Sequence, residues 1–167
     1  MNEIKNRVAE SSLITIDMKS FVGSQEREKI DISKWLHQGV VLKEKRFREF
    51  LNNEQWIKYQ NKYVAIYCSV DTIIPIWAYM LITKYLNPFT RNVVFGDEKE
   101  LEKKIFEINI NQIQLNELQD KRVLVKGCAD TYIPDESYVQ ISNKLIGTVK
   151  SLMFGEACSN VPIYKST

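Results

Sequence analysis

Three cysteines and a few carboxylates carry most of the reactive side chains in this sequence. Cys68, Cys128 and Cys158 each lie at or just after the end of a short apolar run. Thiolates bind zinc and iron–sulfur clusters, and they also attack electrophiles and disulfides. The carboxylates that accompany the cysteines are Asp71, Asp97, Asp130 and Glu156. Any chemistry depends on whether the chain brings these groups to one place.

Two segments of the chain resemble each other and include two of the cysteines. Residues 63–97 and 123–156 align when one residue near Val70 is omitted, and Cys68 then aligns with Cys128. Other matched pairs are Asp71/Asp130, Thr72/Thr131, Pro75/Pro134, Tyr79/Tyr138 and Phe95/Phe154. Two copies are too few for a solenoid. We therefore expect an internal repeat within a single domain that covers residues 1–167, a usual length for one domain.

The repeat also predicts the secondary structure of each copy. Residues 91–96 form a short apolar run that ends in Gly-Asp, which indicates a buried strand, and residues 150–155 should match it. Each copy then contains a strand, a cysteine-containing turn, a helix and a parallel strand. We predict an α/β fold with a mostly parallel sheet of about four strands, built from two duplicated βαβ units. Further predicted elements are a strand at 13–17, helices within 43–59 and 98–110, and an irregular tail at 156–167.

This arrangement would place the cysteines beyond the carboxyl ends of parallel strands, the edge at which open α/β sheets bind ligands. The segment Asp-Thr-x-Ile-Pro follows Cys68 and, in the second copy, Cys128. We expect Asp71 or Thr72, and likewise Asp130 or Thr131, to cap the helix that follows. Amide N–H groups at a helix N-terminus would favour the thiolate form of a nearby cysteine.

Three hypotheses fit these residues. The first is a zinc or iron–sulfur site formed by Cys68, Cys128 and Cys158, although the chain has no Cys-x-x-Cys motif. Candidates for a fourth ligand or a supporting group are Asp71, Asp130, Glu156 and His37. The second hypothesis is a non-catalytic interaction module with buried structural cysteines, whose partner surface would include Trp77, Tyr79 and Tyr164. The third is a thiol enzyme that exchanges persulfides or disulfides.

Composition and motifs argue against several other classes of protein. The net charge is +2 and the basic residues are scattered, so we expect no nucleic-acid partner. The longest apolar run, Ile73–Ile82, is too short to span a bilayer, and the N-terminus has no apolar signal core, so we expect a cytoplasmic protein without a membrane partner. Neither Gly-x-Gly-x-x-Gly nor a phosphate-binding loop motif is present. The sequence leaves the oligomeric state and any enzymatic activity open.

Several uncommon strings occur in order along the chain: LKEKRFREF, IIPIWAYML, VVFGD, VKGC and MFGEACSNVPIYK. With these strings the chain resembles a family of small Bacteroidetes proteins known as the domain of unknown function number 2480. The resemblance covers nearly the whole chain and includes the positions of Cys68, Cys128 and Cys158. It implies a bacterial cytosolic protein and indicates no particular activity for it. It also implies iron–sulfur assembly proteins as partners, because genes of this family lie near iron–sulfur assembly genes.

Overall fold

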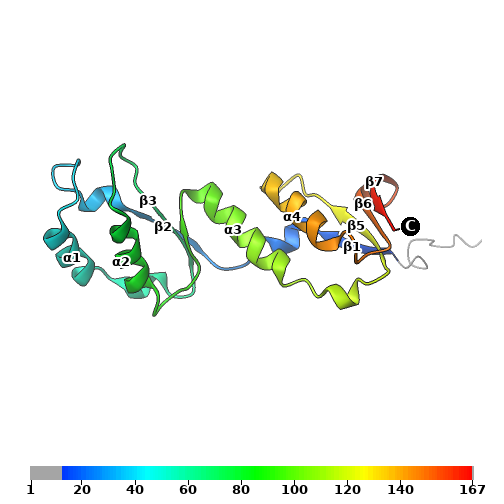
Figure 1. Ribbon diagram of the computed structural model, residues 1–167, viewed down its shortest axis with the longest axis horizontal. Helices are drawn as coiled ribbons and strands as arrows, with labels where there is room; N and C mark the ends of the chain where they lie inside the picture. The colour runs from blue at the N-terminus through cyan, green and yellow to red at the C-terminus, as the bar shows by residue number, and fades with distance from the viewer. Residues whose placement is uncertain (1–12, 167) are drawn as a thin grey trace, which may run out of the picture. The chain divides into compact units, whose positions relative to one another are not determined.

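A computed structural model describes residues 13–166, and the chain divides into two compact units (Figure 1). Unit 1 contains the residues up to Gly23 and those from Ile105 onward, whereas unit 2 contains Ser24–Lys104. Unit 2 is therefore inserted into unit 1 in the sequence. Each unit has its own sheet and its own buried core.

Unit 2 contains a three-stranded parallel sheet in the order β2-β3-β4. Its elements are β2 (Arg27–Asp31), η2 (Ile32–Trp35), α1 (Glu44–Asn53), η3 (Trp56–Tyr59), β3 (Tyr63–Tyr67), α2 (Ile76–Leu86) and β4 (Val93–Phe95). The central strand β3 is buried along most of its length, as expected for a strand in a parallel sheet. Helix α1 is amphipathic, and its buried residues Phe47 and Leu51 lie one turn apart.

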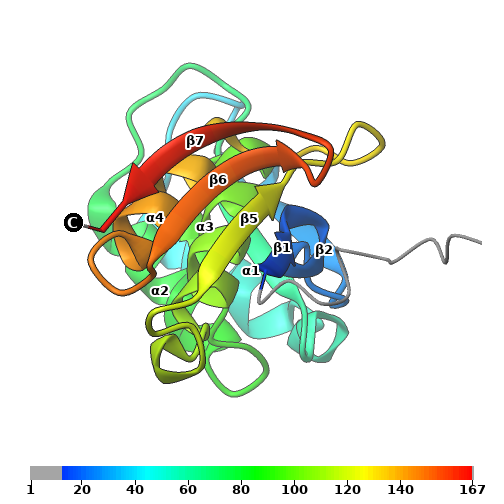
Figure 2. The same cartoon turned by 90° about the vertical axis from the view of Figure 1, so that its right-hand side faces the viewer.

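Unit 1 contains a four-stranded sheet in the order β1-β5-β6-β7, in which β7 is antiparallel to β6 and the other pairs are parallel (Figure 2). Its elements are β1 (Leu13–Asp17), η1 (Met18–Phe21), η4 (Leu115–Glu117), β5 (Arg122–Lys126), α4 (Asp135–Leu145), β6 (Ser151–Glu156) and β7 (Ser159–Lys165). Helix α3 (Glu98–Asn111) begins in unit 2 and ends in unit 1. Its Asn109 amide donates a hydrogen bond of 2.8 Å to the carbonyl of Phe21, within unit 1.

The two units repeat the same order of elements: strand, 3₁₀ turn, helix, 3₁₀ turn, strand, helix, strand. From α1 and α3 onward, matching residues lie 59 positions apart without a gap. Strands β3 and β5 end at residues 67 and 126, and helices α2 and α4 begin at residues 76 and 135. The cores follow the same spacing, with Phe47/Phe106, Leu51/Ile110, Ile82/Ile141 and Leu86/Leu145 all buried. The duplication is therefore longer than the sequence comparison indicated.

This register corrects the alignment of the cysteines. Asp31 pairs with Tyr67 in unit 2, and Asp17 pairs with Lys126 in unit 1. Without the omitted residue, Cys68 corresponds to Gly127, and Cys128 corresponds to Ser69. The alignment without a gap is the correct one because β3 and β5 bury matching side chains. Shifting β3 by one residue relative to β5 would match buried side chains with side chains on the opposite face of the sheet.

The predicted α/β class, with mostly parallel strands and two duplicated βαβ units, is confirmed. The predicted elements at 13–17, 43–59 and 98–110 are also found. The structure differs from the prediction in two respects. Each βαβ unit has a sheet of its own, and the tail that was expected to be irregular forms strand β7.

Candidate functional site

A pocket of about 450 Å³ lies at the carboxyl edge of the unit 2 sheet. It is formed by the end of β3, the loop that leads to α2, the first half of α2 and the end of β4. The residues that line it are Tyr67, Cys68, Ser69, Val70, Asp71, Thr72, Ile74, Tyr79 and Phe95. This is the position at which open α/β sheets bind ligands.

Asp31, at the end of β2, fixes the loop beside this pocket. Its carboxylate accepts hydrogen bonds from the backbone N–H of Ser33 (2.9 Å) and of Ser69 (3.0 Å). Burial by itself raises the pKa of Asp31, but the hydrogen bonds from Ser69 and Ser33 outweigh it and hold the pKa below its usual value. The hydroxyl of Thr72 donates to the carbonyl of Val40 at 2.6 Å, so the loop is held at a second point.

An aromatic pair forms one wall of the pocket. The rings of Tyr79 and Phe95 meet edge to face, with their centroids 5.0 Å apart. Burial raises the pKa of Tyr79, and the nearby Cys68 adds to this effect. Cys68 itself is half-buried and packs against the unit 2 core. The pocket thus combines one thiol, one exposed carboxylate (Asp71) and an apolar wall, which suits a mixed polar and apolar ligand or side chain.

The matching edge of unit 1 differs chemically. Gly127 stands at the place of Cys68, and a Cβ atom there would come within 3.0 Å of the Tyr138 hydroxyl. Cys128 instead lies one residue later, with its sulfur 3.8 Å from the hydroxyl of Thr131. Lys126 forms an ion pair of 3.1 Å with Glu156. The two units therefore share a scaffold but not a thiol site.

The predicted ligand residues lie in different units. Cys68 and Asp71 belong to unit 2, whereas Cys128, Asp130, Glu156 and Cys158 belong to unit 1. Within residues 13–166, no group of three or more His, Cys, Asp or Glu side chains could hold a metal ion. The three-cysteine zinc or iron–sulfur site stays a prediction.

The expected helix caps are wrong. Helices α2 and α4 begin directly after Pro75 and Pro134, and neither N-cap makes a side-chain hydrogen bond. Residues 69–75 separate Cys68 from α2, and residues 129–134 separate Cys128 from α4. The Asp-Thr segments therefore belong to the loops, where their backbone cannot start a helix ahead of the proline. Neither thiol adjoins a helix N-terminus.

His37, the remaining candidate ligand, also lies in unit 2. Its Nδ1 atom is 3.0 Å from a guanidinium nitrogen of Arg46. Burial lowers the pKa of His37, and the positive charges of Lys43 and Arg46 lower it further.

Comparison with known families gives one match, which extends over residues 2–166 and therefore over nearly the whole chain. The chain belongs to the family described as protein of unknown function, DUF2480. No curated protein and no solved structure matches the chain. Within residues 13–166, no helix of this DUF2480 chain combines the length and apolar character needed to cross a membrane.

The DUF2480 chain also has a surface that the sequence reasoning missed. Ile73, Ile76 and Met80 have 92%, 74% and 68% of their surface exposed. Ile76 and Met80 lie one turn apart on α2, and Ile73 lies in the loop just before the helix. We call these three residues the α2 patch. The ungapped repeat could have pointed to Ile76, because Asp135 stands in α4 where Ile76 stands in α2. The other two positions match Tyr132 and Val139, which are also exposed.

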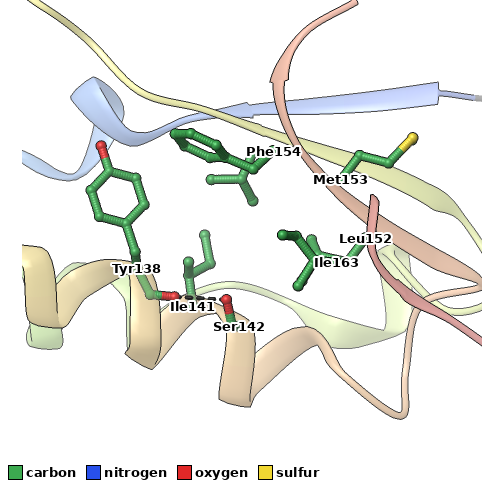
Figure 3. Close-up of a pocket in the computed structure, with 8 residues that line it drawn as sticks. Tyr138, Ile141, Ser142, Leu152, Met153, Phe154 and Ile163 are labelled. Carbon is green, nitrogen blue, oxygen red and sulfur yellow. Dashed lines mark hydrogen bonds between the residues drawn. The ribbon is translucent and has the colours of Figure 1, made fainter. Parts of the chain in front are cut away.

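In unit 1 the DUF2480 chain has a small, partly open apolar pocket of about 190 Å³ (Figure 3). It lies between α4 and the strands β5, β6 and β7. Its lining residues are Val125, Tyr138, Ile141, Ser142, Leu152, Met153, Phe154 and Ile163. Ile163 belongs to β7, which has no counterpart in the sheet of unit 2.

Proposed function

We propose that this DUF2480 protein is a cytosolic protein-interaction module, in which the α2 patch of unit 2 binds another protein molecule. This was the second of the three hypotheses, with a different set of contact residues. Trp77 packs edge-on against Phe47 in the core, and Tyr79 packs against Phe95. The proposed contact residues are instead the three of the α2 patch, which are among the most exposed apolar side chains of unit 2.

The single observation that carries the proposal is the difference between α2 and α4. These helices are equivalent, and each begins directly after a proline. Helix α4 has Asp135 and Glu136 in its first turn, whereas α2 has Ile76 and Trp77. Since unit 1 forms the same fold with acidic residues there, the fold does not require an exposed apolar residue at position 76.

The choice of isoleucine has an energetic cost in the free protein. A carboxylate in the first turn of a helix is stabilising by about 0.3–1 kcal/mol, because it faces the positive end of the helix dipole. Helix α2 forgoes this stabilisation and exposes Ile76 to water. A residue that disobeys a local rule without a gain in stability is a candidate for function.

Binding would recover more than this cost. Complete burial of an isoleucine or methionine side chain contributes about 1.5–3 kcal/mol. Because Ile73, Ile76 and Met80 are largely exposed, their burial by a partner would contribute several kcal/mol, before the cost of ordering the partner is subtracted.

The test is an exchange of residues between the two helices. We expect Ile76→Asp to raise the thermal stability of unit 2 and to weaken partner binding about 100-fold, because the burial of one isoleucine side chain is lost. Asp135→Ile in α4 should lower the stability of unit 1 and leave binding unchanged. A photoreactive residue at position 80, with position 139 as its matched control, would identify the bound protein in the native host. Binding that survives Ile76→Asp, or equal crosslinking from positions 80 and 139, would refute the proposal.

The other assignments stand as separate proposals, because they concern the cysteines rather than the α2 patch. They are a zinc or iron–sulfur cofactor on Cys68, Cys128 and Cys158, partners among iron–sulfur assembly proteins, and an origin in Bacteroidetes. The resemblance of the sequence to its family supports the last two. Metal analysis tests the first.

A further inference from the structure

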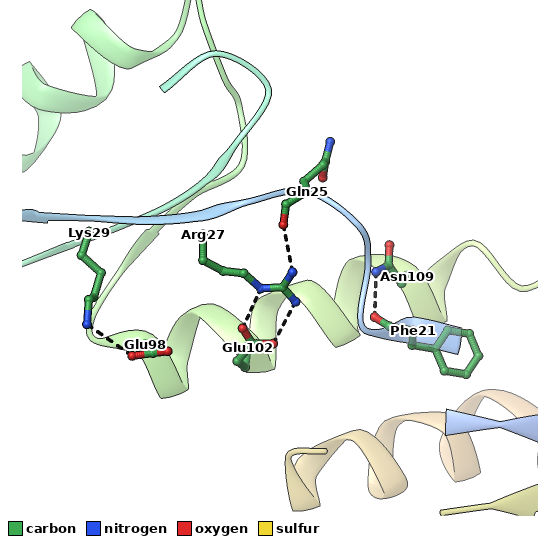
Figure 4. Close-up of polar contacts among 7 residues, drawn as sticks. All are labelled: Phe21, Gln25, Arg27, Lys29, Glu98, Glu102 and Asn109. Carbon is green, nitrogen blue, oxygen red and sulfur yellow. Dashed lines mark hydrogen bonds and ion pairs between the residues drawn. The ribbon is translucent and has the colours of Figure 1, made fainter. Parts of the chain in front are cut away.

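The sheet of unit 2 has two edge strands, β2 and β4. Strand β2 carries charged residues, and its Arg27 and Lys29 form ion pairs with Glu102 and Glu98 of α3, at 2.9 and 3.2 Å (Figure 4). Charged side chains and a covering helix are common ways in which proteins prevent an edge strand from pairing. The β2 edge is therefore protected.

The β4 edge has a different character. The strand consists of Val93, Val94 and Phe95, without a charged residue, and the Phe95 side chain is 71% exposed. In unit 1 the equivalent strand β6 is covered by β7, which runs antiparallel to it. The equivalent phenylalanine there, Phe154, pairs with Val161 of β7 and is only 40% exposed. Unit 1 thus shows what kind of neighbour this edge accepts, which is an antiparallel strand.

From this comparison we infer that a second copy of the chain supplies that neighbour, so that β4 pairs antiparallel with β4 of the second copy across a two-fold axis at Val94. The inference rests on the proposed function and names the molecule that the α2 patch binds. Such pairing is self-complementary, as a two-fold interface must be. It places Val93 opposite Phe95 of the second copy.

The charges that flank β4 fit this arrangement. Arg91 precedes the strand and Asp97 follows it, and both side chains are exposed. One oxygen of the Asp97 carboxylate, Oδ1, accepts hydrogen bonds from the backbone N–H groups of Lys99 and Glu100, and the charge of the carboxylate still faces solvent. Antiparallel pairing centred on Val94 brings Arg91 of each copy opposite Asp97 of the other. The two-fold axis therefore gives two pairs of opposite charges, whereas a parallel arrangement in register would oppose like charges.

The α2 patch lies on the side of the helix that such a neighbour would meet. In unit 1, Tyr138 and Ser142 of α4 line the pocket beneath Ile163 of β7 (Figure 3). The equivalent residues of α2 are Tyr79 and Thr83, and Ile76 lies on the same face of the helix, one turn from Tyr79 and two turns from Thr83. A two-fold axis normal to the sheet puts both copies of α2 on the same face, next to each other.

Both surfaces are needed for a stable dimer. A specific interface generally buries more than about 1,000 Å² in total, which a three-residue strand cannot provide. The two α2 patches add the apolar area that the strands lack. The β4 edge would then set the orientation of the copies, and the patch would supply most of the affinity.

Sedimentation of the full chain tests the inference. We expect a mass of twice 19.6 kDa that dissociates on dilution. Arg91→Asp should raise the dissociation constant about tenfold, because it opposes Asp97 with a like charge. The matched control is Lys150→Asp at the equivalent exposed position of unit 1, which should leave the mass distribution unchanged.

Crosslinking tests the register. Val94→Cys should form a disulfide-linked dimer on mild oxidation, since facing residues of an antiparallel pair have Cα atoms about 4.5–5.5 Å apart. Met153→Cys, the equivalent residue of β6, should not. A monomeric wild-type chain would overturn this inference, while a different protein crosslinked from position 80 would still support the interaction module. A dimer that is insensitive to both Arg91→Asp and Ile76→Asp would refute both proposals.

Discussion

Truncation of one buried phenylalanine should destabilise one unit and leave the stability of the other unchanged. Phe47 in α1 and Phe106 in α3 are equivalent in the repeat, and neither has any exposed surface. Phe47 packs edge to face against Trp35 at 5.5 Å and Trp77 at 5.9 Å. Replacement of a buried phenylalanine by alanine costs about 3–5 kcal/mol, through lost burial and the cavity that remains.

The natural fluorophores make the two units distinguishable. All three tryptophans, Trp35, Trp56 and Trp77, lie in unit 2, so tryptophan fluorescence follows the unfolding of unit 2 alone. Hydrogen exchange of the backbone amides of β5 reports the unfolding of unit 1. We expect Phe47→Ala to lower the urea midpoint measured by fluorescence by about 2–3 M. Phe106→Ala should leave that midpoint in place and accelerate exchange in β5.

The outcome that would refute this reasoning is equally clear. If each substitution shifts both probes by the same amount, the chain unfolds as one cooperative domain. That result would confirm the single domain predicted for residues 1–167. A fluorescence change with Phe106→Ala and none with Phe47→Ala would contradict the division of the core between the units.

Three further predictions concern the candidate site. The folded-state pKa of Asp31 is lowered, so its contribution to stability is complete above the unfolded pKa of about 3.9 and is lost as the pH falls through the folded value. Asp31→Asn should therefore destabilise unit 2 at pH 7 and reduce the loss of its unfolding free energy as the pH falls. If the unfolding free energy of the variant depends on pH as that of the wild type does, this role of Asp31 is contradicted. Alkylation at neutral pH should be fastest at Cys158, which is exposed, and a much faster Cys68 or Cys128 would favour the thiol enzyme. Protein purified without oxygen should lack stoichiometric zinc and iron if the cysteines are structural. Bound metal that is lost when all three are replaced by serine would instead establish the metal site.

Much of the fold was predictable because its local signals are strong. The apolar run at 91–96 ends in Gly-Asp, and the repeat extended the prediction of a strand to residues 150–155. The buried pattern of α3 was equally clear. Strand β7 gave no such signal, because it is an exposed edge strand that contains Pro162.

The candidate site was harder to predict, because it depends on register and on distant pairing. Matching Cys68 with Cys128 required an omitted residue that the hydrogen-bonded ladders do not allow. The sequence did not predict that Ile76 is exposed, because an isoleucine at this place fits a helical pattern equally well when it is buried. Only its comparison with Asp135 at the ungapped spacing distinguishes the two cases.

The inserted arrangement also sets the order in which the protein can form on the ribosome. Strand β1 pairs with β5, and the partners Thr15 and Leu124 are 109 residues apart in the chain. All of unit 2 is synthesised between them. At a synthesis rate of about 5–20 residues per second, β5 follows β1 after roughly 5–20 s. During this time all three strands of the unit 2 sheet are synthesised, so unit 2 can fold before β1 has a partner. A nascent chain interrupted before β5 should therefore hold a folded unit 2 beside an unpaired, apolar β1, and this strand is the segment that a chaperone would need to protect.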